Sequence, residues 1–133
     1  MKLFPTVDAT CSVLTKVMDK PWGNERILEH INDKYTIKIL IIKPGQETSL
    51  QFHKTKTETM LCISGSGVIE YKEENDKLKT EEFKAGKYIT LHSFVIHRVK
   101  NTSNKDLIII ECATSELDDV VRLEDKYGRC NNI

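Results

Sequence analysis

The sequence predicts an all-β fold, either an antiparallel sandwich or a barrel, formed by a single domain. Short stretches rich in β-branched residues recur along the 133-residue chain, and such stretches form strands when turn residues separate them. Glycine and asparagine supply these turns, for example at Ser64–Gly67 and Asn101–Asn104. Regular short strands joined in this way are typical of sandwiches and barrels. A chain of this length can also bury the core that such a fold needs.

The N-terminal part of the chain is weakly patterned. We interpret residues 1–19 as an extension packed on or beside the barrel, with a short helix from Cys11 to Met18. Pro21 and Gly23 follow. They end any helix, because proline restricts the residue before it and glycine frees its own backbone. We therefore expect residues 20–133 to form the single domain.

From residue 35 onward the elements can be placed individually. Tyr35–Lys43 is rich in isoleucine and ends at Pro44 and Gly45, which predicts a strand with a turn behind it. Apolar residues between Leu117 and Leu123 recur with a helical period, which predicts a short C-terminal helix that covers part of the barrel. The predicted strands are Tyr35–Lys43, Met60–Ile63, Gly67–Glu73, Leu78–Phe83, Tyr88–Leu91, His97–Lys100 and Leu107–Cys112.

Composition excludes several classes of function. The chain has 20 basic and 20 acidic residues, so it lacks the positive charge that binds nucleic acid or an anionic membrane surface. It shows neither a signal peptide nor an apolar stretch long enough to span a membrane, so we expect a cytoplasmic protein. Its four cysteines are far apart and form no Cys-x-x-Cys pair, which predicts reduced thiols rather than disulfides or a zinc finger.

Four polar residues form a candidate metal site. Gln51 and His53 are two apart, so a strand would point both side chains to the same face. Glu58 follows after a short connection, and His97 is the fourth candidate. Imidazole, carboxylate and amide groups suit one divalent transition metal, with zinc as the first choice and manganese, iron, cobalt or nickel as alternatives. His92 precedes His97 in a predicted turn and is left out of this set.

Two blocks of the sequence resemble the metal-binding pattern of the cupin superfamily. In the first block, Gly45, His53, Glu58 and Gly65 stand at the spacings of that pattern, and Gln51 takes the place of its first histidine. The second block matches at the residues Gly86, His97 and Asn101, while His92 and Phe94 replace its proline and glycine. The resemblance implies a double-stranded β-helix, which is a small jelly-roll-like barrel, over residues 20–133.

Within this superfamily, the chain resembles the type II mannose-6-phosphate isomerases. They form the C-terminal domain of bifunctional mannose-6-phosphate isomerase/mannose-1-phosphate guanylyltransferases. The most specific mark is the C-terminal block Asp125-Lys-Tyr127-Gly-Arg129. The resemblance implies an isomerase that interconverts mannose 6-phosphate and fructose 6-phosphate, and by analogy a homodimer. It also implies two sets of site residues. Arg129 and Lys38 are the expected catalytic cations, and Lys56, Arg98 and Tyr127 are the expected substrate-binding residues.

Some residues depart from the family pattern. Lys56 stands where that family commonly has arginine, Met60 where it commonly has tryptophan, and Phe94 where the superfamily has glycine. A lysine keeps the positive charge but lacks the planar fork with which arginine holds phosphate. Two alternatives therefore stay open: another cupin enzyme acting on a phosphorylated or nucleotide-linked sugar, and a metal- or sugar-binding cupin module without catalysis.

Overall fold

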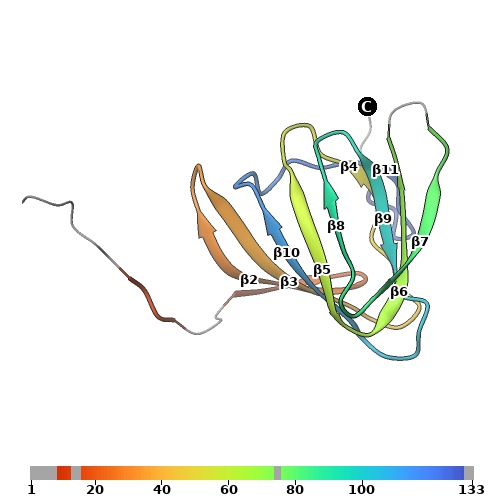
Figure 1. Cartoon of the computed structure of the whole chain (residues 1–133), viewed down its shortest axis with the longest axis horizontal. Coiled ribbons are helices and arrows are strands. Elements are labelled where there is room, and N and C mark those ends of the chain that lie inside the picture. Colours follow the sequence, from red (N-terminus) through yellow and green to blue (C-terminus); the bar gives the residue numbers. More distant parts are fainter. Residues whose placement is uncertain (1–8, 13–15, 74–75, 131–133) are drawn as a thin grey trace, which may run out of the picture.

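A computed structural model of the chain describes residues 9–12, 16–73 and 76–130 and contains two antiparallel sheets that face each other (Figure 1). The six-stranded sheet has the order β1-β2-β3-β10-β5-β8, and the five-stranded sheet has the order β11-β4-β9-β6-β7. The strands of the first sheet are β1 (Lys16–Lys20), β2 (Gly23–Ile31), β3 (Tyr35–Ile42), β10 (Leu107–Ala113), β5 (Glu58–Ser64) and β8 (Tyr88–Leu91). Those of the second are β11 (Val121–Glu124), β4 (Leu50–Phe52), β9 (Ile96–Lys100), β6 (Ser66–Lys72) and β7 (Lys79–Lys84).

The inner face of the large sheet changes character along its strands, and this change positions the site. In β3 and β10 the paired residues Leu40 and Ile109 are buried and apolar. Two residues further along the same face the paired residues are Lys38 and Glu111, which are also buried. Because residues i and i+2 of a strand share a face, the space between the sheets is an apolar core at one end and a polar cavity at the other.

The apolar end is closely packed. Its buried residues come from both sheets and from the turn after β1. Burial of such side chains contributes roughly 1.5–3 kcal/mol each, so this end stabilises the fold and leaves the polar end free for chemistry. The core residues are Trp22, Leu40, Ile42, Met60, Cys62, Ile69, Phe83, Leu91, Val99, Leu107 and Ile109.

Gly65 shows why the first motif block ends on glycine. Its φ is +85°, and a Cβ atom at this position would lie 2.4 Å from the backbone oxygen of Asp106. Only glycine fits so close an approach in this left-handed conformation. The turn between β5 and β6 therefore holds the chain against the loop before β10.

The expected C-terminal helix is wrong. Val121–Glu124 form the strand β11, which pairs antiparallel with β4. Among the described residues no helix is present, and accordingly none is long and apolar enough to cross a membrane. The apolar spacing between Leu117 and Leu123 was too short to separate a helix from a loop followed by a strand, and the β-branched Val121 favours the strand.

The expected N-terminal helix is wrong where it can be checked. Lys16 to Met18 belong to β1, which pairs with β2 at the edge of the large sheet, whereas residues 13–15 lie outside the described part of the chain. The predicted boundary between residues 19 and 20 falls inside this strand. Neither β1 nor its neighbour β2 contains a fully buried residue, so both carry only a weak alternating pattern and were not predicted.

Candidate metal centre and cavity

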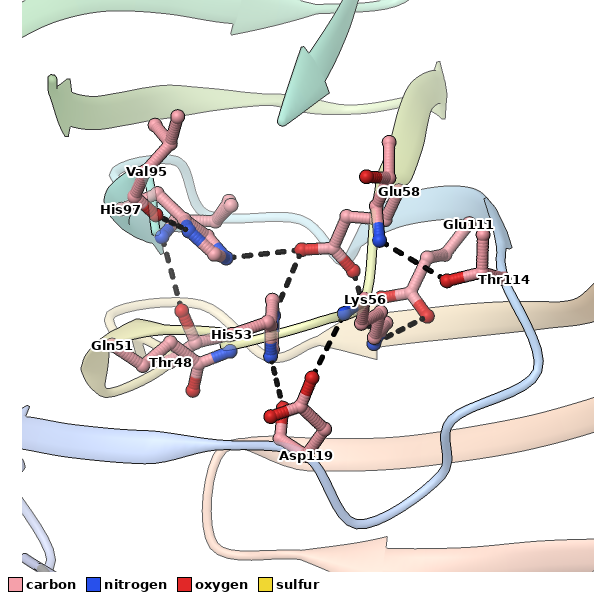
Figure 2. A network of polar contacts seen from close by, with 12 residues as sticks. Thr48, Gln51, His53, Lys56, Glu58, Val95, His97, Glu111, Thr114 and Asp119 are labelled. Carbon is pink, nitrogen blue, oxygen red and sulfur yellow. Dashed lines mark hydrogen bonds and ion pairs between the residues drawn. The ribbon is translucent and has the colours of Figure 1, made fainter. Parts of the chain in front are cut away.

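Three buried side chains converge in the polar cavity. His53 directly follows β4, Glu58 begins β5, and His97 lies in β9. The Oε1 atom of Glu58 lies 3.2 Å from Nε2 of His53 and 3.0 Å from Nε2 of His97 (Figure 2). One ligand atom from each residue lies within 4.8 Å of the others. This group could hold a metal ion.

The orientation of both imidazoles fits a metal ion. Nδ1 of His97 donates to the backbone oxygen of Val95 at 2.9 Å, and Nδ1 of His53 donates to the backbone oxygen of Asp119. A neutral imidazole that keeps its proton on Nδ1 carries its free electron pair on Nε2, and in both residues this atom faces the carboxylate of Glu58. Three electron-pair donors then face one another and attract a cation, and such carbonyl contacts are the usual support of metal-binding histidines.

Gln51, the fourth predicted ligand, lines the same cavity. It pairs with His97 across β4 and β9, so the two residues are neighbours in the sheet. Its Oε1 atom accepts a hydrogen bond from the hydroxyl group of Ser49 at 2.6 Å, which holds the amide in place. The residues that converge on Oε1 of Glu58 are the two histidines, and Gln51 is not among them. Its role as a ligand therefore stays a prediction.

The second oxygen of Glu58 faces Lys56. It forms no hydrogen bond in the structure, but Nζ of Lys56 lies 3.1 Å away. Burial acts to raise the pKa of Glu58, yet hydrogen bonds from His53 and His97 and the charge of Lys56 outweigh it and hold this pKa well below its usual range. The carboxylate is therefore ionised, as a metal ligand must be.

Lys56 connects Glu58 to a further carboxylate, that of Glu111. Nζ of Lys56 lies 3.3 Å from Oε2 of Glu111 (Figure 2). Burial acts to lower the pKa of Lys56, but the two carboxylates raise it above its ordinary value. Burial, together with the negative charge of Glu58, raises the pKa of Glu111 to about 8. Lys56 is thus a charged link between two buried acids.

A loop between the two sheets is held by Asp119. Its carboxylate accepts hydrogen bonds from the backbone N–H groups of Lys54, Thr55 and Lys56 at 3.0, 2.7 and 2.8 Å. Burial acts to raise the pKa of Asp119, and these three donors outweigh it and lower the pKa. Because the backbone oxygen of the same residue holds His53, Asp119 orients a ligand and fixes the segment that leads to Glu58.

The cavity measures about 650 Å³, which is large enough for a small organic ligand. Three of the predicted cations line it: Lys38, Lys56 and Arg129. Nζ of Lys38 lies 3.3 Å from Oε2 of Glu25. The side chain of Arg129 donates from Nε and Nη2 to the carboxylate of Asp125 at 2.9 and 3.0 Å. Each of these three cations therefore has a carboxylate partner.

Two predicted substrate-binding residues do not line the cavity. Arg98 follows His97 in β9 and points to the opposite face, where its guanidinium lies 3.1 Å from Glu70 and 3.4 Å from Glu47. Tyr127 donates its hydroxyl proton to Oε1 of Gln46 at 2.6 Å. Contact with substrate stays a prediction for Arg98 and Tyr127, and their positions in the structure favour a structural role.

Sequence reasoning did not find the site roles of Glu111, Asp119 and Ser49. Glu111 lies in an apolar strand and Asp119 in an acidic loop, so neither residue has a spacing that points to a ligand group. A usable signal was present only for Glu111. It continues the inward-facing alternation of Leu107 and Ile109, and a carboxylate at a core position indicates a polar site.

Two facing antiparallel sheets with a His–Glu–His group between them define the chain as a cupin. The family described as "Mannose-6-phosphate isomerase C-terminal" matches residues 8–125. The chain therefore belongs to this family.

Curated relatives support this assignment over most of the chain. The xanthan biosynthesis protein XanB of Xanthomonas campestris and the alginate biosynthesis protein AlgA of Pseudomonas putida are each 33% identical to it over 113 residues, or 83% of the chain. The mannose-1-phosphate guanylyltransferase ManC of Salmonella typhimurium is 31% identical over the same length. The chain spans only 22–23% of the length of these relatives.

Solved structures support the fold. The capsular polysaccharide assembling protein CapF of Staphylococcus aureus superposes with a TM-score of 0.75 at 22% identity, covering 83% of this chain and 34% of CapF. The oxalate decarboxylase OxdC of Bacillus subtilis, in its S161A form, gives a TM-score of 0.72 at 18% identity, covering 82% of this chain and 30% of OxdC. At these identities the likeness concerns the fold alone.

Proposed function

We propose that the chain is a metal-dependent sugar-phosphate isomerase that interconverts mannose 6-phosphate and fructose 6-phosphate. The observation that carries this proposal is the convergence of His53, Glu58 and His97 on one point of a cavity lined by several cationic side chains. The family to which the chain belongs is described by this activity, which supports mannose 6-phosphate as the substrate.

The reaction moves a proton between C1 and C2 of the sugar, so negative charge develops on the neighbouring oxygen atoms. A divalent ion bound by His53, Glu58 and His97, with Gln51 as a fourth ligand, would supply Lewis-acid polarisation at this point. We propose zinc first, and manganese, iron, cobalt or nickel as ions that suit the same nitrogen and oxygen donors.

The cations of the cavity have separate proposed roles. Lys38 and Arg129 would donate hydrogen bonds to the oxygen atoms that gain charge, because fixed donors in a buried site stabilise such charge strongly. Lys56 would contact the sugar hydroxyl groups while its charge keeps Glu58 ionised. Lys38 is buried and Arg129 is half-buried. Both side chains are therefore already held in place, and little conformational entropy is lost when the substrate binds.

A cupin module that binds metal or sugar phosphate without turnover is the second candidate. The pairing of Lys38, Lys56 and Arg129 with carboxylates favours it, because a cation already neutralised by a neighbour attracts a substrate less strongly. Under this hypothesis the cavity would bind the sugar phosphate and leave the sugar unchanged.

Proton NMR of the metal-loaded protein with mannose 6-phosphate in deuterated water tests the isomerase. We expect fructose 6-phosphate to form, and deuterium from the solvent to enter at C1 or C2 as far as the transferred proton exchanges. The variant His97→Ala should abolish product. His30→Ala is the matched control, since His30 lies outside the cavity and its Nδ1 contacts the hydroxyl of Thr36, and it should keep activity.

Product formation that persists in the His97→Ala variant would overturn the assignment of the site. Binding of mannose 6-phosphate with no product over many hours would favour the module without turnover. Conversion of a different sugar phosphate in the same assay would point to another cupin enzyme of sugar metabolism.

We also propose that the chain forms a homodimer through the outer face of its large sheet. A row of apolar side chains crosses four strands there, because Ile110 pairs with Ile39 on one side and with Leu61 on the other, and Leu61 pairs with Tyr88. Tyr88 is 71% exposed and Leu61 is 36% exposed. A contiguous apolar surface of this kind commonly marks an interface.

The size of this face supports a second copy as the occupant. Six strands about 4.8 Å apart and about seven residues long cover roughly 24 by 23 Å, or about 550 Å² of flat area. Side chains add to the accessible area, so the face approaches the roughly 800 Å² per partner of a standard interface. A two-fold dimer uses the same patch on both chains, so one apolar face per chain is enough to form it.

A further inference from the structure

The edge strand β1 forms one wall of the cavity. Lys16, Met18 and Lys20 alternate along it, and all three line the cavity. They share one face of the strand because residues i, i+2 and i+4 point the same way. Lys16 is exposed and Lys20 is half-buried, whereas Lys38 and Lys56 are buried. The two lysines of β1 therefore stand at the rim, above the buried cations of the floor.

The charges at the rim and at the floor differ in their pairing. Lys38 pairs with Glu25, Lys56 with two carboxylates, and Arg129 with Asp125. Within the described residues neither Lys16 nor Lys20 has a carboxylate oxygen within 4.0 Å. A phosphate dianion could bind a cation of the floor only by separating a buried ion pair. At the rim it can bind the ammonium groups of Lys16 and Lys20 without breaking an ion pair of the described residues.

The acidic residues of a neighbouring loop do not cancel this charge. Asp118 and Asp119 line the cavity from the loop before β11. The carboxylate of Asp119 is engaged by three backbone N–H groups, and Asp118 is exposed to solvent. The wall formed by β1 thus contributes positive charge to the cavity.

We propose that Lys16 and Lys20 together bind the phosphate group of the substrate and so set the specificity of the site for phosphorylated sugars. This inference rests on the proposed function and deepens it. Lysine serves as a point charge for phosphate. A phosphate held at the rim leaves the other end of the sugar at the floor, where His53, Glu58 and His97 converge. Cα atoms four residues apart in a strand lie about 13 Å from each other. The register places Lys16 level with Lys38 and Lys20 level with Ile42, so the two long side chains approach a phosphate between them from either side.

The test compares the binding of mannose 6-phosphate and of inorganic phosphate with wild-type protein and the double variant Lys16→Gln/Lys20→Gln by calorimetry. The matched control is Lys87→Gln/Lys105→Gln, which removes the same charge from two exposed lysines that do not line the cavity. We expect the dissociation constant for mannose 6-phosphate to rise about tenfold in the rim variant and less than twofold in the control. Lys16→Gln and Lys20→Gln should each account for part of the change, and Lys16→Arg/Lys20→Arg should keep most of the affinity.

Turnover separates this inference from the proposed function. If the isomerase is active, the rim variant should raise KM about tenfold while kcat stays within about twofold, since the phosphate lies far from C1 and C2. If wild-type protein binds mannose 6-phosphate without turnover, and this binding depends on Lys16 and Lys20, the phosphate contact stands and the isomerase fails. Equal dissociation constants for the rim variant and the control, or no binding of either ligand to wild-type protein, would overturn the inference.

Discussion

At the scale of single residues, the site depends on how a few buried charges are arranged. Lys56 is 7% exposed and joins the carboxylates of Glu58 and Glu111. A buried charge without a partner is strongly unfavourable, whereas a buried charge held between partners is tolerated. Lys56 therefore permits two acids to stand beside each other, and one of them can then serve as a metal ligand.

Replacement of Lys56 should show this stabilisation directly. We expect Lys56→Met to lower the free energy of unfolding by about 3 kcal/mol, because the substitution leaves the ionised carboxylate of Glu58 buried beside Glu111 without its cation. Lys54→Met is the control, since Lys54 is exposed, and it should change stability by less than about 0.5 kcal/mol. Urea denaturation of the metal-free proteins measures both. Equal stability of the two variants would contradict the role of Lys56.

The residues of the candidate metal group could be named from the sequence, but their supports could not. His53 was expected on a strand, Glu58 after a short connection and His97 in the second motif block, and this spacing identified all three. Their supports are backbone oxygen atoms of Val95 and Asp119, and a backbone group leaves no mark in the sequence. The polar end of the barrel also depends on the register that pairs Glu111 with Lys38, which only the folded sheet defines.

At the scale of elements, the strands β6 and β9 are joined on their outer side by ion pairs. The carboxylate of Glu70 lies 2.7 Å from Nζ of Lys100 and 3.1 Å from Nη2 of Arg98. The side chain of Glu70 is 9% exposed, so water screens these contacts little. Burial acts to raise the pKa of Glu70, and the two cations outweigh it and lower this pKa.

This pairing predicts a pH-dependent stability. Because the folded-state pKa of Glu70 lies below its ordinary value of 4.5, its contribution is fully present above about pH 4.5 and is lost as the pH falls through the folded-state pKa. We expect Glu70→Gln to cost about 1–2 kcal/mol at pH 7 and nearly nothing once the wild-type carboxylate is protonated in the folded protein. Urea denaturation between pH 2.5 and 7 measures this difference.

The neighbouring strand β7 offers the control. Glu82 is 60% exposed and lies 3.8 Å from Lys84, so Glu82→Gln should have almost no effect at any pH. A loss for Glu70→Gln that stays constant down to pH 2.5 would show that its carboxylate is not the stabilising group.

Whether an element was predicted depended on how much of it is buried. In β3 and β10 every second residue is buried, and the sequence shows this alternation clearly. β2 is polar and half-exposed, and β4 has three residues, so neither carries a periodic signal.

The turn before β9 contains Phe94 at a position where the cupin pattern has glycine. Its backbone φ is 69°, and its ring stacks on that of Phe52 with the ring centres 5.8 Å apart. Phe94 in place of glycine therefore adopts the left-handed backbone conformation of this turn, which strains its backbone.

At the scale of the whole molecule, the two faces of the large sheet have opposite character. Its inner face carries Lys38 and Glu111 beside the cavity, while its outer face carries the row of Ile39, Ile110 and Leu61. A sheet that places charges inside and isoleucines outside is most stable when its outer face is also covered. The proposed homodimer supplies that cover with a second copy of the same face.

Light scattering after gel filtration tests this proposal. We expect wild-type protein to have the mass of two chains and Leu61→Asp the mass of one, because a carboxylate at the centre of an apolar interface is costly to bury. Thr80→Asp is the control, since Thr80 is exposed on β7 of the other sheet, and it should stay dimeric. A monomeric wild-type protein at all concentrations would contradict the proposal.

The most direct test of the account is to measure metal content and isomerase activity on the same samples, for wild-type protein and for Glu58→Gln. We predict one divalent ion per chain in wild-type protein, activity that chelation removes and metal restores, and loss of both ion and activity in Glu58→Gln, since the substitution removes the only charged ligand of the group. Circular dichroism verifies that the variant is folded. Conversion of mannose 6-phosphate by metal-free protein, or by Glu58→Gln at the wild-type rate, would contradict the account.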